Sequence, residues 1–164
     1  MYVISTENAT GSQIFINGAR NLHVINACNL NLTVSNSTVS YTRSKVNYDS
    51  PTIETCASAG SLTASNSTFQ MIVAGRMEAL NLVKSTAREI QLDDVQHVEL
   101  VNETDVKLFV GTVNGQTILK NSSLSFLNTY FKGGLHALDV VFQRVSPLES
   151  QTYRYFCNNF CIWC

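Results

Sequence analysis

Residues 29–40 read NLNLTVSNSTVS, and a near copy of their central part returns thirty residues later. The segment Leu32-Thr-Val-Ser-Asn-Ser-Thr-Val39 aligns with Leu62-Thr-Ala-Ser-Asn-Ser-Thr-Phe69, and the two copies differ only at two apolar positions. Each copy holds two alternating apolar residues, then Ser-Asn-Ser-Thr, then another apolar residue. This order predicts a short strand, a polar corner led by Asn, and the start of the next strand.

Similar apolar pairs, separated by one residue, recur from Ile14 to Phe142 at starts about 7 to 10 residues apart. The gaps between them carry Asn, Ser, Thr, Gly or Asp, which are the residues of tight corners. Residues 77–90 are rich in helix formers, but Leu80-x-Leu82 and Ile90-x-Leu92 keep the spacing of strands. We therefore expect strands throughout this region.

Two architectures fit many short strands: an antiparallel sandwich or barrel, and a parallel solenoid. A sandwich should show recurring hairpin turns, yet Asn-Gly or Asp-Gly occurs only at Asn17-Gly18 and Asn114-Gly115. Three spacings of about eight residues give a coil of about 24 residues, a repeat length of stacked architectures. We predict an all-β parallel solenoid of about six coils over residues 1–145, followed by a separate segment, 146–164, with the sandwich as the alternative.

The repeats resemble those of right-handed parallel β-helix proteins of the pectate-lyase-like group over residues 11–145. The segments that carry the resemblance end on Asn: Asn21–Asn26, Leu32–Asn36, Leu62–Asn66, Val98–Asn102 and Ile118–Asn121. The resemblance implies a right-handed winding and a ladder of stacked Asn side-chain amides, including Asn36 and Asn66. It does not fix the function, because this fold hosts lyases, hydrolases, adhesins and viral fibre proteins.

Seven large apolar residues should point into the core of such a solenoid. They are Leu32, Leu62, Leu82, Leu92, Leu100, Leu108 and Phe126.

The last segment breaks the pattern and is rich in aromatic residues, which suits a cap over the open apolar end of a solenoid. The aromatic residues are Tyr153, Tyr155, Phe156, Phe160 and Trp163. Cys157, Cys161 and Cys164 can hold this cap by a disulfide, and Cys28 and Cys56 can pair if they lie on neighbouring coils. Because five cysteines is an odd number, one thiol is left free or pairs between molecules. The same C-terminal spacing also resembles the cluster-binding loop of radical S-adenosylmethionine enzymes, although the barrel that follows the loop in that family has no counterpart here.

The composition favours some partners over others. Charged residues make up 14% of the chain and the net charge is -1, with no Lys/Arg cluster, which argues against a nucleic-acid-binding face. A surface kept wet by Ser, Thr and Asn suits contacts with carbohydrate, protein or other copies of the chain. No apolar run approaches the roughly 18 residues of a membrane helix. Residues 1–8 do not read as a signal peptide, so the chain is intracellular, mature, or preceded by a missing part.

Asn-x-Ser/Thr sequons are more frequent than the roughly three expected by chance. Six occur, at Asn8, Asn31, Asn36, Asn66, Asn102 and Asn121. The excess favours a secreted glycoprotein, with Asn31 as the best acceptor because it lies between two inward leucines. Alternatively, a corner written Asn-Ser-Thr produces sequons as a by-product of the fold.

Candidate catalytic and metal-binding residues do not form a recognisable set. The carboxylates and bases are Asp93, Asp94, Glu99, Asp105, Lys107 and Arg88, and the histidines are His23, His97 and His136. Adjacent Asp93 and Asp94 are expected at a solvated corner, and no two histidines have metal-ligand spacing. Thr33, Thr63 and Thr68 do not form the regular row that ice binding would need. The sequence therefore assigns no catalytic residue, metal ligand or cofactor.

We accordingly expect a non-enzymatic structural or binding module outside the cell or at a cell or virion surface. An adhesin, a fibre and a filament subunit are examples, and the partner would be a protein surface, a carbohydrate surface or further copies of the chain. The alternative is a polysaccharide lyase or hydrolase of the pectate-lyase-like group, which would need several acids and a base on one face.

Overall fold

The computed structural model describes residues 2–5, 12–25, 30–43, 45–46, 53–54 and 60–145. The strands are β1 (Tyr2–Ser5), β2 (Ser12–Asn17), β3 (Leu22–Ile25), β4 (Leu30–Ser35), β5 (Thr38–Arg43), β6 (Lys45–Val46), β7 (Ile53–Glu54), β8 (Ser61–Ser65), β9 (Thr68–Val83), β10 (Thr86–Phe131) and β11 (Leu135–Val145). The stretch 77–90, rich in helix formers, lies in β9 and β10, so the expectation of strands there is confirmed.

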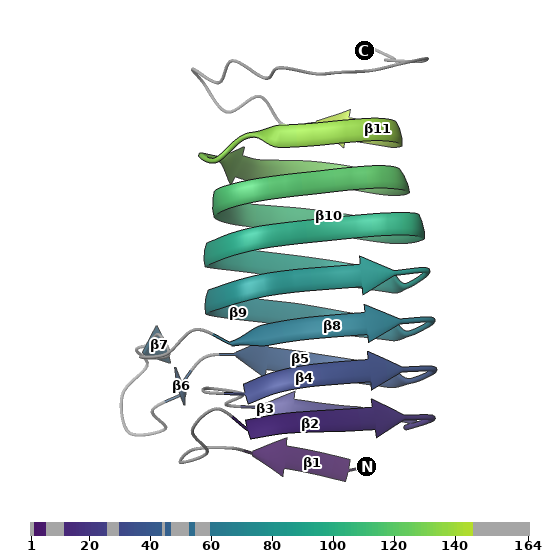
Figure 1. The fold of residues 1–164 in the computed structure, drawn as a ribbon, viewed down its shortest axis with the longest axis vertical. Helices are drawn as coiled ribbons and strands as arrows, with labels where there is room; N and C mark the ends of the chain where they lie inside the picture. The colour runs from purple at the N-terminus through teal and green to yellow at the C-terminus, as the bar shows by residue number, and fades with distance from the viewer. Residues whose placement is uncertain are drawn as a thin grey trace.

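The chain forms a parallel β-solenoid of about six turns, stacked along one axis (Figure 1). Within the described ranges the strand pairs of the large sheet are parallel, from β1 with β3 to β10 with β11. The antiparallel pair β6–β7 is a separate two-stranded sheet. A sandwich or up-and-down barrel needs antiparallel neighbours, so the alternative architecture is wrong. No helix in the described ranges is long and apolar enough to cross a membrane.

Most coils take 18 residues rather than the expected 24, and the coil from Asn102 to Asn121 takes 19. Ser61 pairs with Ala79, Ala79 with His97, and Thr117 with Leu135, each eighteen positions along the chain. The step from Leu32 to Leu62 is longer because the segment between β5 and β8, which includes β6 and β7, is inserted there.

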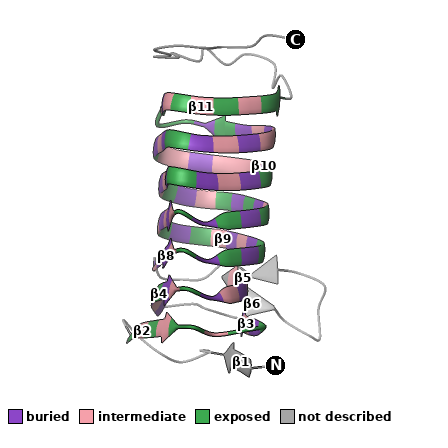
Figure 2. Ribbon diagram, turned by 90° about the vertical axis from the view of Figure 1, so that its right-hand side faces the viewer, coloured by how far each residue is buried: buried purple, intermediate pink, exposed green. Residues whose placement is uncertain are grey.

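The 18-residue coil follows from the spacing of its inward side chains. In one coil the buried residues are Leu80, Leu82, Ser85, Ala87, Ile90, Leu92, Val95 and then Val98. Their spacing is two along a flat side and three at a corner, where two successive residues face outward. Because the chain stays extended through most of these corners, β9 and β10 continue around the solenoid as long strands (Figure 2). The predicted coil is too long because it assigns about eight residues to each strand together with the corner that follows it.

The predicted core is mostly confirmed. Five of the seven residues are at most 4% exposed: Leu32, Leu62, Leu82, Leu92 and Leu100. Leu108 and Phe126 are instead half-buried, because they lie at a three-residue corner. There Val106 and Phe109 point inward in place of Leu108, and Leu127 is buried in place of Phe126.

One corner of every coil has a residue in the left-handed backbone conformation. These residues are Gly18, Asn36, Asn66, Lys84, Asn102, Asn121 and Asp139, with φ between 45° and 70°. Asn and Gly tolerate this conformation better than other residues do, which explains why Asn occupies the left-handed position of the Ser-Asn-Ser-Thr corner. Asn36 and Asn66 therefore lie at corners, as predicted.

The ladder at this corner is made of hydroxyl groups rather than amides. The Ser67 Oγ accepts a hydrogen bond from the Ser37 N–H (3.2 Å) and donates one to the Ser65 carbonyl (2.7 Å). The Ser85 Oγ repeats this one coil further on, accepting from the Ser67 N–H, and Thr104 continues the series. The Asn36 amide does donate to the Asn17 Oδ1 (3.0 Å), but it does so at the exposed surface. The amide ladder implied by the resemblance is thus replaced by a buried stack of Ser and Thr hydroxyls.

Some of the predictions fall outside the described residues. They concern the cap segment 146–164, all five cysteines (Cys28, Cys56, Cys157, Cys161 and Cys164), and the sequon at Asn8.

Candidate functional site

The acidic candidates do not converge on one face. Asp94 lies between coils, where it approaches Arg76 (Nε–Oδ2, 4.0 Å) and accepts hydrogen bonds from the side-chain amides of Gln96 (2.9 Å) and Asn114. These contacts link three successive coils, so Asp94 has a structural role. Asp93 is exposed beside it, as expected of a solvated corner.

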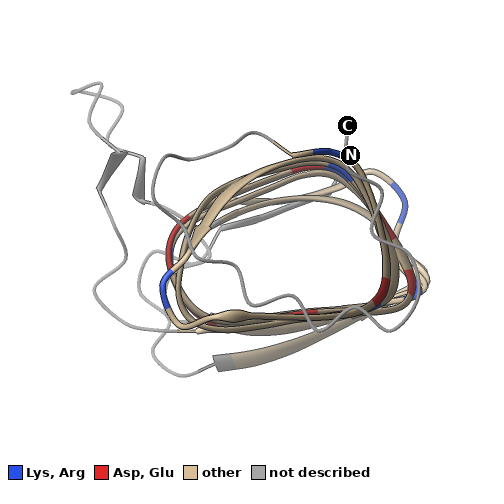
Figure 3. Cartoon of the chain, turned by 90° about the horizontal axis from the view of Figure 1, so that it is seen from above, with Lys and Arg blue, Asp and Glu red and all other residues tan. Residues whose placement is uncertain are grey.

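The remaining charged candidates are divided among different sides of the solenoid. Glu99 pairs in register with Asn81, whereas Asp105 follows the left-handed corner and accepts a hydrogen bond from the Ser123 Oγ (2.6 Å). Arg88 and Lys107 are exposed. Seen along the axis, acidic and basic positions are spread around the ring (Figure 3).

The histidines lie in different coils. His23 pairs in register with Val3 and Ser40, His97 with Ala79, and His136 with Ile118. Across the described ranges there is no group of three or more His, Cys, Asp or Glu residues that could hold a metal ion.

The described sequons differ in accessibility. Asn36, Asn66, Asn102 and Asn121 are exposed at the left-handed corner. Asn31 is half-buried, and its Oδ1 accepts hydrogen bonds from the Ser61 N–H (3.0 Å) and Oγ (3.1 Å). The corner residues are therefore more accessible than the predicted best acceptor; glycosylation itself stays a prediction.

Threonines form two short columns rather than one regular row. Thr33 pairs with Thr63 on one side, and Thr38, Thr68 and Thr86 are neighbours on the next. The Thr86 Oγ1 donates to the Thr68 Oγ1 (3.2 Å). Thr68 thus belongs to a different column from Thr33 and Thr63, in agreement with the sequence.

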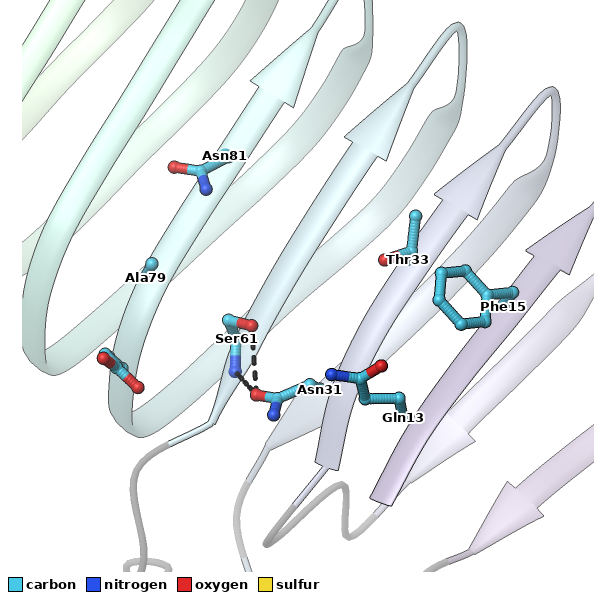
Figure 4. Close-up of a pocket in the computed structure, with 8 residues that line it drawn as sticks. Gln13, Phe15, Asn31, Thr33, Ser61, Ala79 and Asn81 are labelled. Atoms are coloured by element: carbon cyan, nitrogen blue, oxygen red, sulfur yellow. Dashed lines mark hydrogen bonds between the residues drawn. The ribbon is translucent and has the colours of Figure 1, made fainter. Parts of the chain in front are cut away.

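A groove of about 410 Å³ crosses the outer side of β2, β4, β8 and β9. Five lining side chains carry amides or hydroxyls: Gln13, Asn31, Thr33, Ser61 and Asn81. Phe15, Glu78 and Ala79 complete the lining. In Figure 4, Asn31 lies between Gln13 and Ser61, with its two hydrogen bonds to Ser61 drawn as dashed lines, and Phe15 lies beside Thr33.

Two features make this groove chemically distinctive. Phe15 is 74% exposed, more than any other exposed large apolar residue in the described ranges. The Asn81 Oδ1 is buried but has no hydrogen-bond partner within the described part of the chain. The groove therefore combines an apolar ring in contact with water and an unsatisfied acceptor.

Sequence reasoning did not single out this groove. The strand spacing places Phe15 outward, because it lies between Ile14 and Ile16, which pack against the core. The sequence signal that could have indicated this groove is therefore an aromatic residue in an outward position of a strand. The alignment of Gln13, Asn31 and Ser61 depends on the 18-residue register and on the inserted segment, neither of which the repeats alone revealed.

No protein family model matches the chain, and no curated protein or solved structure matches it either.

Proposed function

We propose that the protein is a non-enzymatic structural or binding module, such as an adhesin, fibre or filament subunit, that acts outside the cell or at a cell or virion surface. The observation that carries this proposal is the separation of the acidic candidates: Asp94 bonds neighbouring coils, while Glu99 and Asp105 lie on different sides. General acid–base chemistry on a polysaccharide needs carboxyl groups about 5–10 Å apart around one bond.

The regular stacking of the coils also supports a structural role. Parallel strands and buried hydroxyl bonds connect each coil to the next, so the described solenoid is a rod of stacked coils, most of which are 18 residues long. A repeating polar surface suits contact with a protein surface, a carbohydrate surface or further copies of the chain. Nucleic acid is not an expected partner.

The test compares adsorption and assembly with catalysis. The purified chain is incubated with a panel of plant, bacterial and animal polysaccharides, and both reducing ends and unsaturated products are measured. In parallel, its sedimentation and electron micrographs are recorded, and its retention on polysaccharide- or cell-coated surfaces is measured. Retention or self-assembly without product formation is expected. Turnover of any polysaccharide that is lost in Glu78→Gln would overturn the proposal in favour of a lyase or hydrolase.

We further propose that the solenoid winds to the right, as its resemblance to pectate-lyase-like proteins implies, and that residues 146–164 cap its end through a disulfide. Support for a cap comes from β11, which pairs with β10 and whose core-packed residues Leu135, Val140 and Phe142 are only partly buried. Thiols are titrated on the unfolded, unreduced protein. Five free thiols would refute the disulfide, and iron with bound sulfide would favour the cluster loop.

A further inference from the structure

We infer that the groove across β2, β4, β8 and β9 binds a neutral saccharide, with Phe15 as its stacking platform and the Asn81 amide as a hydrogen-bonding group. The inference rests on the proposed binding function and gives it a ligand class.

Phe15 provides the apolar part of the site. The residue is 74% exposed on a strand whose neighbouring apolar residues, Ile14 and Ile16, pack against the core. Leaving so much aromatic surface in water is unfavourable, and burying it against a ligand recovers that free energy. Sugars have one face of C–H groups, which can lie flat on such a ring.

The amides provide the polar part of the site. The Asn81 Oδ1 is buried without a partner in the described part of the chain, and a buried acceptor is normally satisfied. A sugar hydroxyl can donate the missing hydrogen bond. The Asn31 Oδ1 is occupied by Ser61, which fixes the Asn31 amide and leaves its N–H groups as donors.

Gln13 adds a third amide to the same groove. Amides present donors and acceptors together, and sugar hydroxyls can pair with both. A few placed polar groups beside an apolar surface are typical of small-ligand sites, and about 410 Å³ lies within their range of roughly 300–1,000 Å³.

The charge of the groove distinguishes between classes of saccharide. Glu78 is the charged residue among the eight that line it, and none of these eight is Lys or Arg. A carboxylate without a lining cation repels polyuronates such as polygalacturonate, so a neutral saccharide is favoured. Neighbouring strands are about 4.8 Å apart, which is close to the length of one sugar ring, so a linear saccharide laid across the coils can meet one strand per ring.

The experiment is a titration of the whole chain with neutral oligosaccharides from cellulose, xylan, mannan and β-1,3-glucan, and with oligogalacturonate, followed by calorimetry. We expect binding to at least one neutral saccharide and weaker or no binding to oligogalacturonate. Phe15→Ala should weaken binding by roughly tenfold or more, because it removes the stacking surface. Asn81→Ala should also weaken it.

Tyr130→Ala is the matched control, because Tyr130 is an exposed aromatic residue (42%) that does not line the groove. Its binding should equal that of the parent chain, and thermal unfolding of each variant verifies the fold. The inference is wrong if no neutral saccharide binds, if only oligogalacturonate binds, or if Phe15→Ala binds as well as Tyr130→Ala.

The two proposals fail in different ways. Adhesion or assembly without saccharide binding would refute the saccharide site and leave the structural function standing. Saccharide binding that leads to turnover would support the site and refute the non-enzymatic function.

Discussion

The buried hydroxyl ladder can be tested at Ser67, which is 3% exposed. Its Oγ accepts from the Ser37 N–H at 3.2 Å and donates to the Ser65 carbonyl at 2.7 Å. Ser67→Ala leaves the Ser37 N–H without this partner while changing the side-chain volume little. The Ser65 carbonyl still accepts a hydrogen bond from the Asn36 N–H (3.1 Å). One unsatisfied buried group costs about 1–3 kcal/mol, so we expect a loss of about 2 kcal/mol in the free energy of unfolding.

The assay is equilibrium unfolding in urea, followed by circular dichroism. With a slope of about 2 kcal/mol per M, the midpoint of Ser67→Ala should fall by about 1 M at an unchanged slope. Ser67→Thr is the hydroxyl-retaining control, because Thr104 occupies the corresponding position two coils further on and its Oγ1 donates to the Val101 carbonyl (2.7 Å). Gln70→Ala, at an exposed position, should change the free energy by less than about 0.5 kcal/mol. A loss in Ser67→Ala no larger than that in Gln70→Ala would refute the energetic role of the ladder.

Three further substitutions test the coil geometry by the same assay. Leu100→Ala, at a fully buried site, should cost about 2–5 kcal/mol, and Leu108→Ala at its half-buried corner should cost clearly less; equal losses would contradict the three-residue corner. Gly115→Ala should lower the free energy of unfolding by more than ordinary overpacking does, which costs about 1–3 kcal/mol, because the added Cβ would overlap the Gln96 carbonyl oxygen. An unchanged urea midpoint would show that the coils are further apart at this position. Asn66→Gly should be nearly neutral, whereas Asn66→Ala should cost about 1–2 kcal/mol at a φ of 45°, and the reverse order would exclude the left-handed corner.

The architecture was predictable because a buried side of a strand imposes its period directly on the sequence. Leu80-x-Leu82 and Val98-x-Leu100 show the period of two, and each pair is buried. The corners were harder to locate, because two outward residues change the spacing to three without a glycine or proline to mark the place. Leu108 was assigned to the core for this reason, although Phe109 is the residue that fills it.

The groove was less predictable than the fold, because its residues are brought together by register rather than by sequence spacing. Asn31 and Ser61 are hydrogen-bonded across an insertion of unpredictable length. A strand pattern shows that Phe15 points outward, but it cannot show which outward side chains of the neighbouring coils lie next to it. Repeats that reveal the stacking of coils therefore reveal little about the surface that the stacking creates.

The geometry of the left-handed corner also explains the excess of sequons. In the corner Asn66-Ser67-Thr68, each residue has a separate structural role, since Asn66 adopts the left-handed conformation, Ser67 joins the buried ladder, and Thr68 begins the next side facing outward. Four of the six sequons lie at this corner of the coil: Asn36, Asn66, Asn102 and Asn121. Lys84-Ser85-Thr86 builds the same corner without Asn. The fold thus accounts for these four sequons, and the remaining two, at Asn8 and Asn31, do not exceed the roughly three expected by chance. Only the sugar content of the natural protein can decide whether the exposed corner is glycosylated.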